Sequence, residues 1–246
     1  MAIACARHGC YALNALVDIY LGEQHKNVDF ALIKSIGKTR VHRSQGILII
    51  YDIACQYCVH LIERIGDHLP AGIAIDAGIG LFHVHAHKDQ CFFRYATSFI
   101  PGAGIVAGEI LESLWSSLNA ISPIARTATL AHRAEMLDDH ATDSNHKKML
   151  GIHLSLSKKY AEAISMLEVA GKYYAELSAT ATPMARNLWT DEIELAEASR
   201  MDNISAMDIY AARLSSQTQQ PSSPPCTAEA PAEKWITFAL MVEEKQ

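Results

Sequence analysis

The chain has 246 residues, of which 50% are hydrophobic and 20% are charged, the balance of an ordinary soluble globular protein. A formal net charge of −6 argues against a general nucleic-acid coat, because such proteins carry a basic face. No run of 18 or more apolar residues occurs, so we expect no membrane span. The start of the chain lacks the basic-then-apolar order of a secretory signal, which favours an intracellular protein. In that setting its six cysteines are expected to be thiols or metal ligands rather than disulfides.

The first half of the chain predicts an α/β arrangement. Residues 1–45 form an N-terminal segment that leads into the core, with a short helix over 28–36. An apolar run predicts a buried strand at 46–51, and apolar residues at every fourth position predict an amphipathic helix over 53–66. We expect a second strand at 79–86. The order strand–helix–strand predicts a parallel βαβ crossover.

The second half predicts helices. After Pro101 and a glycine-rich segment, a helix is expected over 106–120, which completes a core domain at 46–120. A helical region follows over 121–212, with a break near 142–145 and a further helix over 184–200. Residues 213–246 form the last part: a Pro-, Ser- and Gln-rich stretch at 215–233 predicts a disordered linker, and a short apolar tail follows it.

Carboxylates stand at two places where a divalent metal ion could be bound. Asp52 ends the predicted strand, and Glu109 and Glu112 share one face of the predicted helix at 106–120. A strand-end aspartate with a helical glutamate is typical of metal-dependent phosphoryl transfer. The alternatives are a helix N-cap for Asp52 and a solvated helix face for the two glutamates. The acidic pair Asp138–Asp139 is expected to be a solvated face.

Histidines and cysteines form a second candidate site. His83, His85 and His87 alternate along the predicted strand, so they would share one face, and Cys91 follows four residues later. These are ligands that zinc prefers, but a hydrogen-bonded or DNA-facing histidine row fits the alternation equally. Cys55 and Cys58 form a C-x-x-C pattern that indicates half of a zinc site, a redox motif or two small buried thiols. The thiols Cys5, Cys10, Cys55 and Cys91 could also combine in one site.

Several segments in a fixed order resemble one family. YDIACQY, FHVHAHKDQC, IPGAGIVAGEILESLWSSLN and AHRAEMLDDH are similar to segments of the Kyakuja-Dileera-Zisupton transposases, which are abundant in mushroom-forming fungi. The resemblance is strong over residues 3–150 and looser to about 212. It implies a fungal, nuclear protein with a ribonuclease-H-like core that binds transposon DNA ends, uses Mg²⁺ or Mn²⁺ for strand cleavage and transfer, and could form oligomers.

The resemblance also assigns individual residues. Asp52 matches the second aspartate of the family's Asp–Asp–Glu set, and Glu112 is favoured over Glu109 because it precedes Trp115 as in the family's E-x-x-W pattern. The family's first aspartate lies upstream of the segment that matches ACARHGC at the start of this chain. Asp18 and Asp29 are the aspartates that precede the Asp52 strand, and neither is predicted to end an apolar strand. We therefore expect an N-terminally truncated, inactive fragment with a partial ribonuclease-H-like core followed by an all-helical region.

Two other interpretations remain open on the sequence. The chain could be a domesticated, non-enzymatic fragment that binds DNA or protein through its helical half. It could also be a domain that zinc stabilises through the histidines and cysteines, and such a zinc ion could coexist with either of the other functions.

Overall fold

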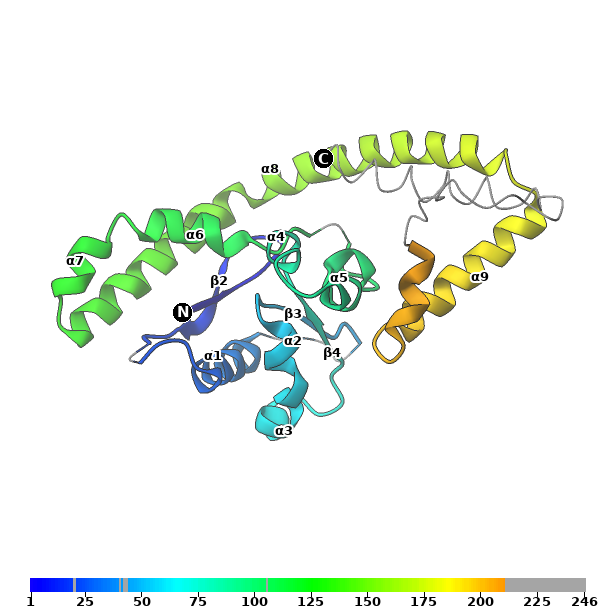
Figure 1. The fold of residues 1–246 in the computed structure, drawn as a ribbon. Coiled ribbons are helices and arrows are strands. Elements are labelled where there is room, and N and C mark those ends of the chain that lie inside the picture. The colour runs from blue at the N-terminus through cyan, green and yellow to red at the C-terminus, as the bar shows by residue number, and fades with distance from the viewer. Residues whose placement is uncertain (20, 40, 42–43, 105, 211–246) are drawn as a thin grey trace. The chain divides into compact units, whose positions relative to one another are not determined.

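The computed structural model describes residues 1–19, 21–39, 41, 44–104 and 106–210, and shows a mixed α/β protein (Figure 1). The chain divides into two units, Met1–Leu156 and Ser157–Gln246. The first unit holds both sheets, and the described part of the second is helical. The predicted linker at 215–233 and the apolar tail lie outside the described residues. No helix among the described residues is long and apolar enough to cross a membrane.

The first sheet is a hairpin that the sequence analysis did not predict. Strands β1 (Ala2–Ala4) and β2 (Tyr11–Leu16) pair antiparallel, with an irregular register between them. The side chain of Asn145 fixes β2 from outside: its Oδ1 accepts the Tyr11 N–H at 2.8 Å, and its Nδ2 donates to the Tyr11 carbonyl at 2.9 Å. The strands were missed because they are short and interrupted by polar residues, which obscures the alternation that marks a strand.

The second sheet confirms the predicted parallel crossover. Strand β3 (Ile47–Ile50) pairs with β4 (Ile75–Gly78) in parallel, and the predicted strand at 46–51 is therefore confirmed. The helix expected over 53–66 is present as two short helices, α2 (Ala54–Tyr57) and α3 (Leu61–Ile65), with a 3₁₀ turn at Cys58–His60 between them.

The second predicted strand, at 79–86, is wrong. Strand β4 comes earlier, and Leu81–Val84 forms the short helix α4, followed by α5 (Asp89–Tyr95). Strand β4 contains Asp76 and Gly78, which are poor strand formers, so the sequence hides it. A residue distant in the sequence stabilises the start of helix α4: the Glu109 carboxylate accepts the Phe82 N–H. Local alternation of apolar residues and histidines cannot report such a contact.

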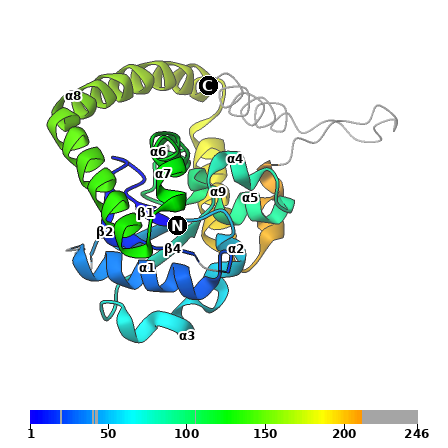
Figure 2. The ribbon, with the colours of Figure 1, turned by 90° about the vertical axis from the view of Figure 1, so that its left-hand side faces the viewer.

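The main apolar core lies between α1 (His25–Lys38) and the α2–α3 segment. The helix predicted over 28–36 is confirmed within α1. The buried side chains of this core come from both segments: Val28, Leu32, Ile36, Tyr57, Leu61 and Ile65. The views in Figure 1 and Figure 2 agree that α1 and α3 lie on one side of the strands, and that α4 and α6 (Ile110–Leu118) lie on the other.

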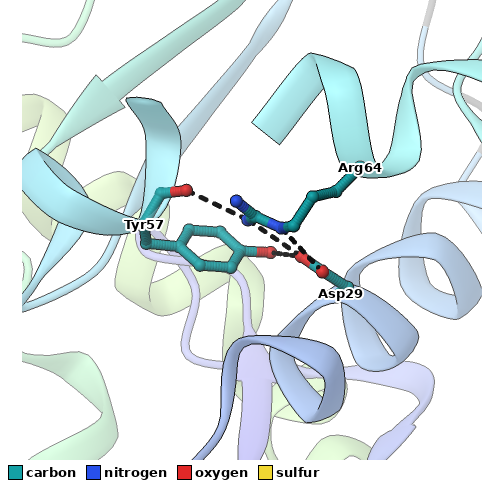
Figure 3. A network of polar contacts seen from close by, with 3 residues as sticks. All are labelled: Asp29, Tyr57 and Arg64. Carbon is teal, nitrogen blue, oxygen red and sulfur yellow. Dashed lines mark hydrogen bonds and ion pairs between the residues drawn. The ribbon is translucent and has the colours of Figure 1, made fainter. Parts of the chain in front are cut away.

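A polar network is embedded at the edge of this core (Figure 3). The buried Tyr57 hydroxyl donates to Asp29 Oδ1 at 2.7 Å, and the Arg64 guanidinium donates to both oxygens of Asp29 at 2.9 and 3.1 Å. Arg64 also donates to the Tyr57 carbonyl at 3.0 Å. Burial and the nearby Asp29 raise the pKa of Tyr57 above its ordinary range, so the phenol stays protonated as a donor. The network joins α1 to α2 and α3.

The remaining helices follow the sequence more closely. Helix α6 confirms the helix expected over 106–120 within narrower bounds, and α7 (Ser122–Thr127) precedes α8 (Leu130–Ser178). The predicted break at 142–145 is wrong, because α8 continues through it. That segment has no glycine or proline, and a salt bridge of 2.6 Å between Asp143 and Lys147 supports successive turns.

The second unit contains the helix expected over 184–200. Helix α9 (Pro183–Ser199) starts where Thr182 accepts the Ala185 N–H at 3.2 Å, and proline at the first helical position suits a helix start. A 3₁₀ helix at Ile204–Tyr210 returns along α9, with Met207 buried. The Tyr210 hydroxyl donates to Glu197 at 2.7 Å and fixes this return.

Candidate functional site

Asp52 lies in the turn between β3 and α2, two residues after the half-buried strand β3 ends at Ile50. Its side chain is 59% exposed. The predicted alternative, a helix N-cap, is wrong: Ile53 occupies the N-cap position of α2, and no side chain caps that helix. The carboxylate is therefore accessible to solvent and to a ligand.

His83 brings Asp52 and Glu112 together. Its Nε2 lies 3.7 Å from Asp52 Oδ1 and 4.0 Å from Glu112 Oε1. The three side chains come from the β3–α2 turn, from α4 and from the first turn of α6. We call them the oxygen cluster. One imidazole thus lies near a carboxylate oxygen from each of two separate elements.

Glu109 has a different place from Glu112. It occupies the N-cap position of α6, and its Oε1 accepts the Phe82 N–H at the start of α4 at 2.7 Å. A Cβ atom on Gly80 would lie 2.8 Å from that same oxygen, so the contact requires glycine at position 80. Glu109 thus holds α4 against the segment before α6, whereas Glu112 is 66% exposed in the oxygen cluster.

Gly108 makes this close approach feasible. Its φ of +89° is in the region that favours glycine. A Cβ atom there would lie 2.9 Å from both the Gly80 Cα and the Ile50 Cγ2. The backbone before α6 therefore packs directly on the end of β3 and the start of α4, which sets the place of the α6 carboxylates.

A second group of side chains lies close by. Cys55 on α2, His87 after α4 and Cys91 on α5 offer ligand atoms that all lie within 4.8 Å of one another. Cys55 Sγ and His87 Nδ1 are 3.5 Å apart. We call these three residues the sulfur cluster. Two thiols and an imidazole form a set that could hold a metal ion such as zinc.

The prediction that His83, His85 and His87 share one face of a strand is wrong. Because this segment is a helix followed by a turn, the three histidines point to different surroundings. His83 joins the carboxylates, the His85 ring lies 5.4 Å from the Phe92 ring, and His87 joins the thiols. The link between His83 and the carboxylates was missed from the sequence. No local spacing signals it, because Asp52 and Glu112 lie 31 and 29 residues from His83 in the sequence.

The remaining described cysteines are not members of the sulfur cluster. Cys58 packs against both neighbouring apolar cores, and burial raises the pKa of its thiol to about 11, which fits the interpretation of a small buried thiol. Cys5 lies at the β1–β2 turn, with its sulfur 3.3 Å from His8 Nδ1. Among the described residues, the predicted combination of Cys55 with Cys91 is brought together, but Cys5 and Cys10 do not join it.

One family model matches the chain: that of the Kyakuja-Dileera-Zisupton transposases, over residues 1–145. The match includes β1 through α6 and with them both clusters. No curated protein and no solved structure matches. Since the family model covers more than half of the 246 residues, the chain belongs to the Kyakuja-Dileera-Zisupton transposase family.

Proposed function

We propose that Asp52 and Glu112 are the second and third carboxylates of an Asp–Asp–Glu metal site for DNA strand cleavage and transfer. The observation that carries this proposal is their approach to one imidazole from two separate elements. The contact between Glu109 and the α4 backbone favours Glu112 as the metal-binding glutamate. Family membership supports a transposase-related function and DNA as the partner.

The order of elements supports a partial ribonuclease-H-like core. An antiparallel pair, a helix, a parallel crossover and a helix with the glutamate follow one another along the chain. In this assignment β3 corresponds to the core strand that ends in the second aspartate, and α6 to the glutamate-bearing helix. Residues 1–45 lead into this core, 46–120 form it, and 121–212 form the helical region.

The donor set suits the metal that the family uses. Carboxylate oxygens are the ligands that Mg²⁺ and Mn²⁺ prefer, and the exposure of Asp52 and Glu112 leaves room for a phosphate group between protein and solvent. When bound, such a cation polarises a phosphoryl oxygen and activates the attacking hydroxyl. In the protein, Asp52 and Glu112 would hold the cation, and the His83 imidazole would orient both carboxylates.

These residues alone supply two of the three carboxylates, and we propose that the 246-residue polypeptide is inactive by itself. The two aspartates that precede Asp52 among the described residues are engaged elsewhere. Asp29, a residue of α1, is held by Arg64 and Tyr57, and Asp18, two residues after β2, pairs with Arg133 at 2.9 Å. Neither side chain is free to take the place of the first aspartate.

Two measurements on the purified chain test this proposal. Titration with Mn²⁺, followed by electron paramagnetic resonance, should show binding that Asp52→Ala and Glu112→Ala each weaken at least about 10-fold, as expected when a metal site loses a ligand. Glu109→Gln is the matched control, because an amide oxygen can still accept the Phe82 N–H. Mn²⁺ binding that is unchanged in both alanine variants would overturn the metal site.

A cleavage assay tests the inactivity separately. The chain should not nick supercoiled DNA in Mn²⁺ or Mg²⁺ above the level of the Asp52→Ala variant. Robust cleavage that Asp52→Ala abolishes would show that the residues present are sufficient.

The alternative function is non-enzymatic binding. Within the first unit, α8 exposes the large apolar side chains of Met149, Leu150 and Leu154, which favours a protein contact. The affinity of the chain for duplex DNA at several salt concentrations separates the cases. A steep fall with salt indicates phosphate contacts through lysine and arginine, and no binding favours protein contacts alone.

A further inference from the structure

The sulfur cluster gathers three ligands from three places in the chain. Cys55 and His87 are separated by 32 residues, and Cys91 lies in the first turn of a further helix, α5. All three side chains are partly buried, and they lie at the side of the apolar core that includes Ala54, Val84 and Ala96. Such convergence needs the crossover and both short helices to be in place, so it is a property of the fold and not of a local motif.

The distances fit a tetrahedral ion. A zinc ion with Zn–S bonds of about 2.3 Å and Zn–N bonds of about 2.0 Å holds a sulfur and a nitrogen ligand about 3.5 Å apart, and two sulfurs about 3.8 Å apart. Cys55 Sγ and His87 Nδ1 are 3.5 Å apart, and all pairs in the cluster lie within 4.8 Å. Small rotations of the side chains would close the remaining difference.

The donor chemistry also points to zinc. Two sulfurs and one imidazole nitrogen converge in this cluster. Thiolate with imidazole selects zinc over the magnesium or manganese that the oxygen cluster suits.

We propose that Cys55, His87 and Cys91 bind one zinc ion that clamps α2 to the segment carrying α4 and α5. Three protein ligands leave one tetrahedral position for a water molecule. The clamp acts on two of the three elements that carry the oxygen cluster, since Asp52 lies three residues before Cys55 and His83 four residues before His87. Zinc is therefore a positioning ion for Asp52 and His83, and takes no part in the reaction.

Metal analysis of the purified 246-residue chain tests the proposal. After growth with zinc and dialysis against a weak chelator, we expect about one equivalent of zinc per chain, and Cys55→Ser and Cys91→Ser should each lower this at least about 10-fold. Cys58→Ala is the matched control, because it removes the other thiol of the C-x-x-C pattern without touching the cluster. His85→Gln controls for His87→Gln in the same way. Both controls should keep the full equivalent.

Cobalt substitution answers the question even where a cysteine variant fails to fold. Added to the zinc-free wild-type chain, Co²⁺ should give the absorption of a tetrahedral site with thiolate charge-transfer bands, and zinc should displace it. Less than about half an equivalent of bound metal, or unchanged zinc in both serine variants, would overturn the proposal. A disulfide between Cys55 and Cys91 would also overturn it. Its signs would be a mass two hydrogens lower in the metal-free chain as isolated, and protection of both cysteines from alkylation. Neither readout depends on Mn²⁺ binding or DNA cleavage, so this inference stands or falls separately from the proposed function.

Discussion

The oxygen cluster and the sulfur cluster share two parts of the chain, yet their surroundings differ. Asp52 and Cys55 belong to the β3–α2 connection, and His83 and His87 to α4 and its following turn. On one side the carboxylates are more than half exposed, and on the other the thiols are partly buried beside an apolar core. Along the β3–α2 connection, the oxygen donor Asp52 is exposed to solvent, whereas the sulfur donor Cys55, three residues later, is partly buried. The exposed set suits a substrate phosphate, and the inner set suits a structural ion.

The largest expected effect is the removal of zinc from the sulfur cluster. With free zinc at about 1,000 times its dissociation constant, binding to the folded state stabilises a protein by about 4 kcal/mol. A strong chelator should therefore lower the melting temperature of the first unit by about 10 °C, since 1 kcal/mol corresponds to about 2–4 °C in a domain of this size. Differential scanning calorimetry measures this. Mg²⁺ at the same concentration should restore little of the lost melting temperature. Full restoration by Mg²⁺ would contradict the expected preference of the sulfur cluster for zinc.

A somewhat smaller effect is expected from breaking the polar network of Asp29, Tyr57 and Arg64. Asp29→Ala leaves the buried Tyr57 hydroxyl and the Arg64 guanidinium without their shared carboxylate, and should cost about 3 kcal/mol of unfolding free energy. Urea unfolding followed by circular dichroism measures it. Because the network positions α2 as a whole, Mn²⁺ and zinc affinities should fall together.

The matched control is Asp18→Ala, which breaks the more exposed pair with Arg133 and should cost less than about 1 kcal/mol. Equal losses in the two variants would show that the buried network is no stronger than a surface ion pair.

The sequence predicted the elements whose signals are local. The apolar run Ile47–Ile50 and the helical spacing from Val28 to Ile36 gave β3 and the middle of α1. It failed where distant residues decide the structure. Alternation of Phe82, His83 and Val84 favours a strand, but Glu109, 27 residues away, accepts the Phe82 N–H and supports a helix. Strand β4, with its aspartate and glycine, is made a strand by pairing with β3.

The candidate sites show the same limit. Asp52, Glu112, Cys55, His87 and Cys91 were all candidates by residue type and motif. Their grouping could not be read from the sequence, because a period of two puts the histidines on one face, whereas the helix and the turn after it send His83 and His87 to different clusters. The resemblance to the family favoured Glu112, but only the contact between Glu109 and Phe82 supplies a physical reason for that preference.

The two glutamates of α6 sharpen the comparison further. Glu112→Gln should leave the unfolding free energy within about 0.5 kcal/mol, because the side chain is exposed, and should weaken Mn²⁺ binding about 10-fold. Glu109→Ala should do the reverse: it removes the acceptor of the Phe82 N–H, and a lost cap of this kind costs about 1 kcal/mol. Thermal unfolding and Mn²⁺ titration on both variants measure this. If Glu109→Ala impaired Mn²⁺ binding and Glu112→Gln did not, their roles would be exchanged.

The smallest effect concerns Cys58, the thiol of the C-x-x-C pattern outside the sulfur cluster. Burial raises its pKa from 9.0 to about 11, so the folded state holds the proton more tightly than the unfolded state. Its contribution is fully present below pH 9 and is lost as the pH rises toward 11. Allowing for its partial exposure, we expect about 1 kcal/mol of the alkaline loss in stability of the zinc-free chain to disappear in Cys58→Ala. Urea unfolding at pH 8 and pH 10.5 measures this difference. A steeper alkaline loss in Cys58→Ala than in the wild type would mean that Cys58 is ionised in the folded protein, and the two thiols of the pattern would then share one role.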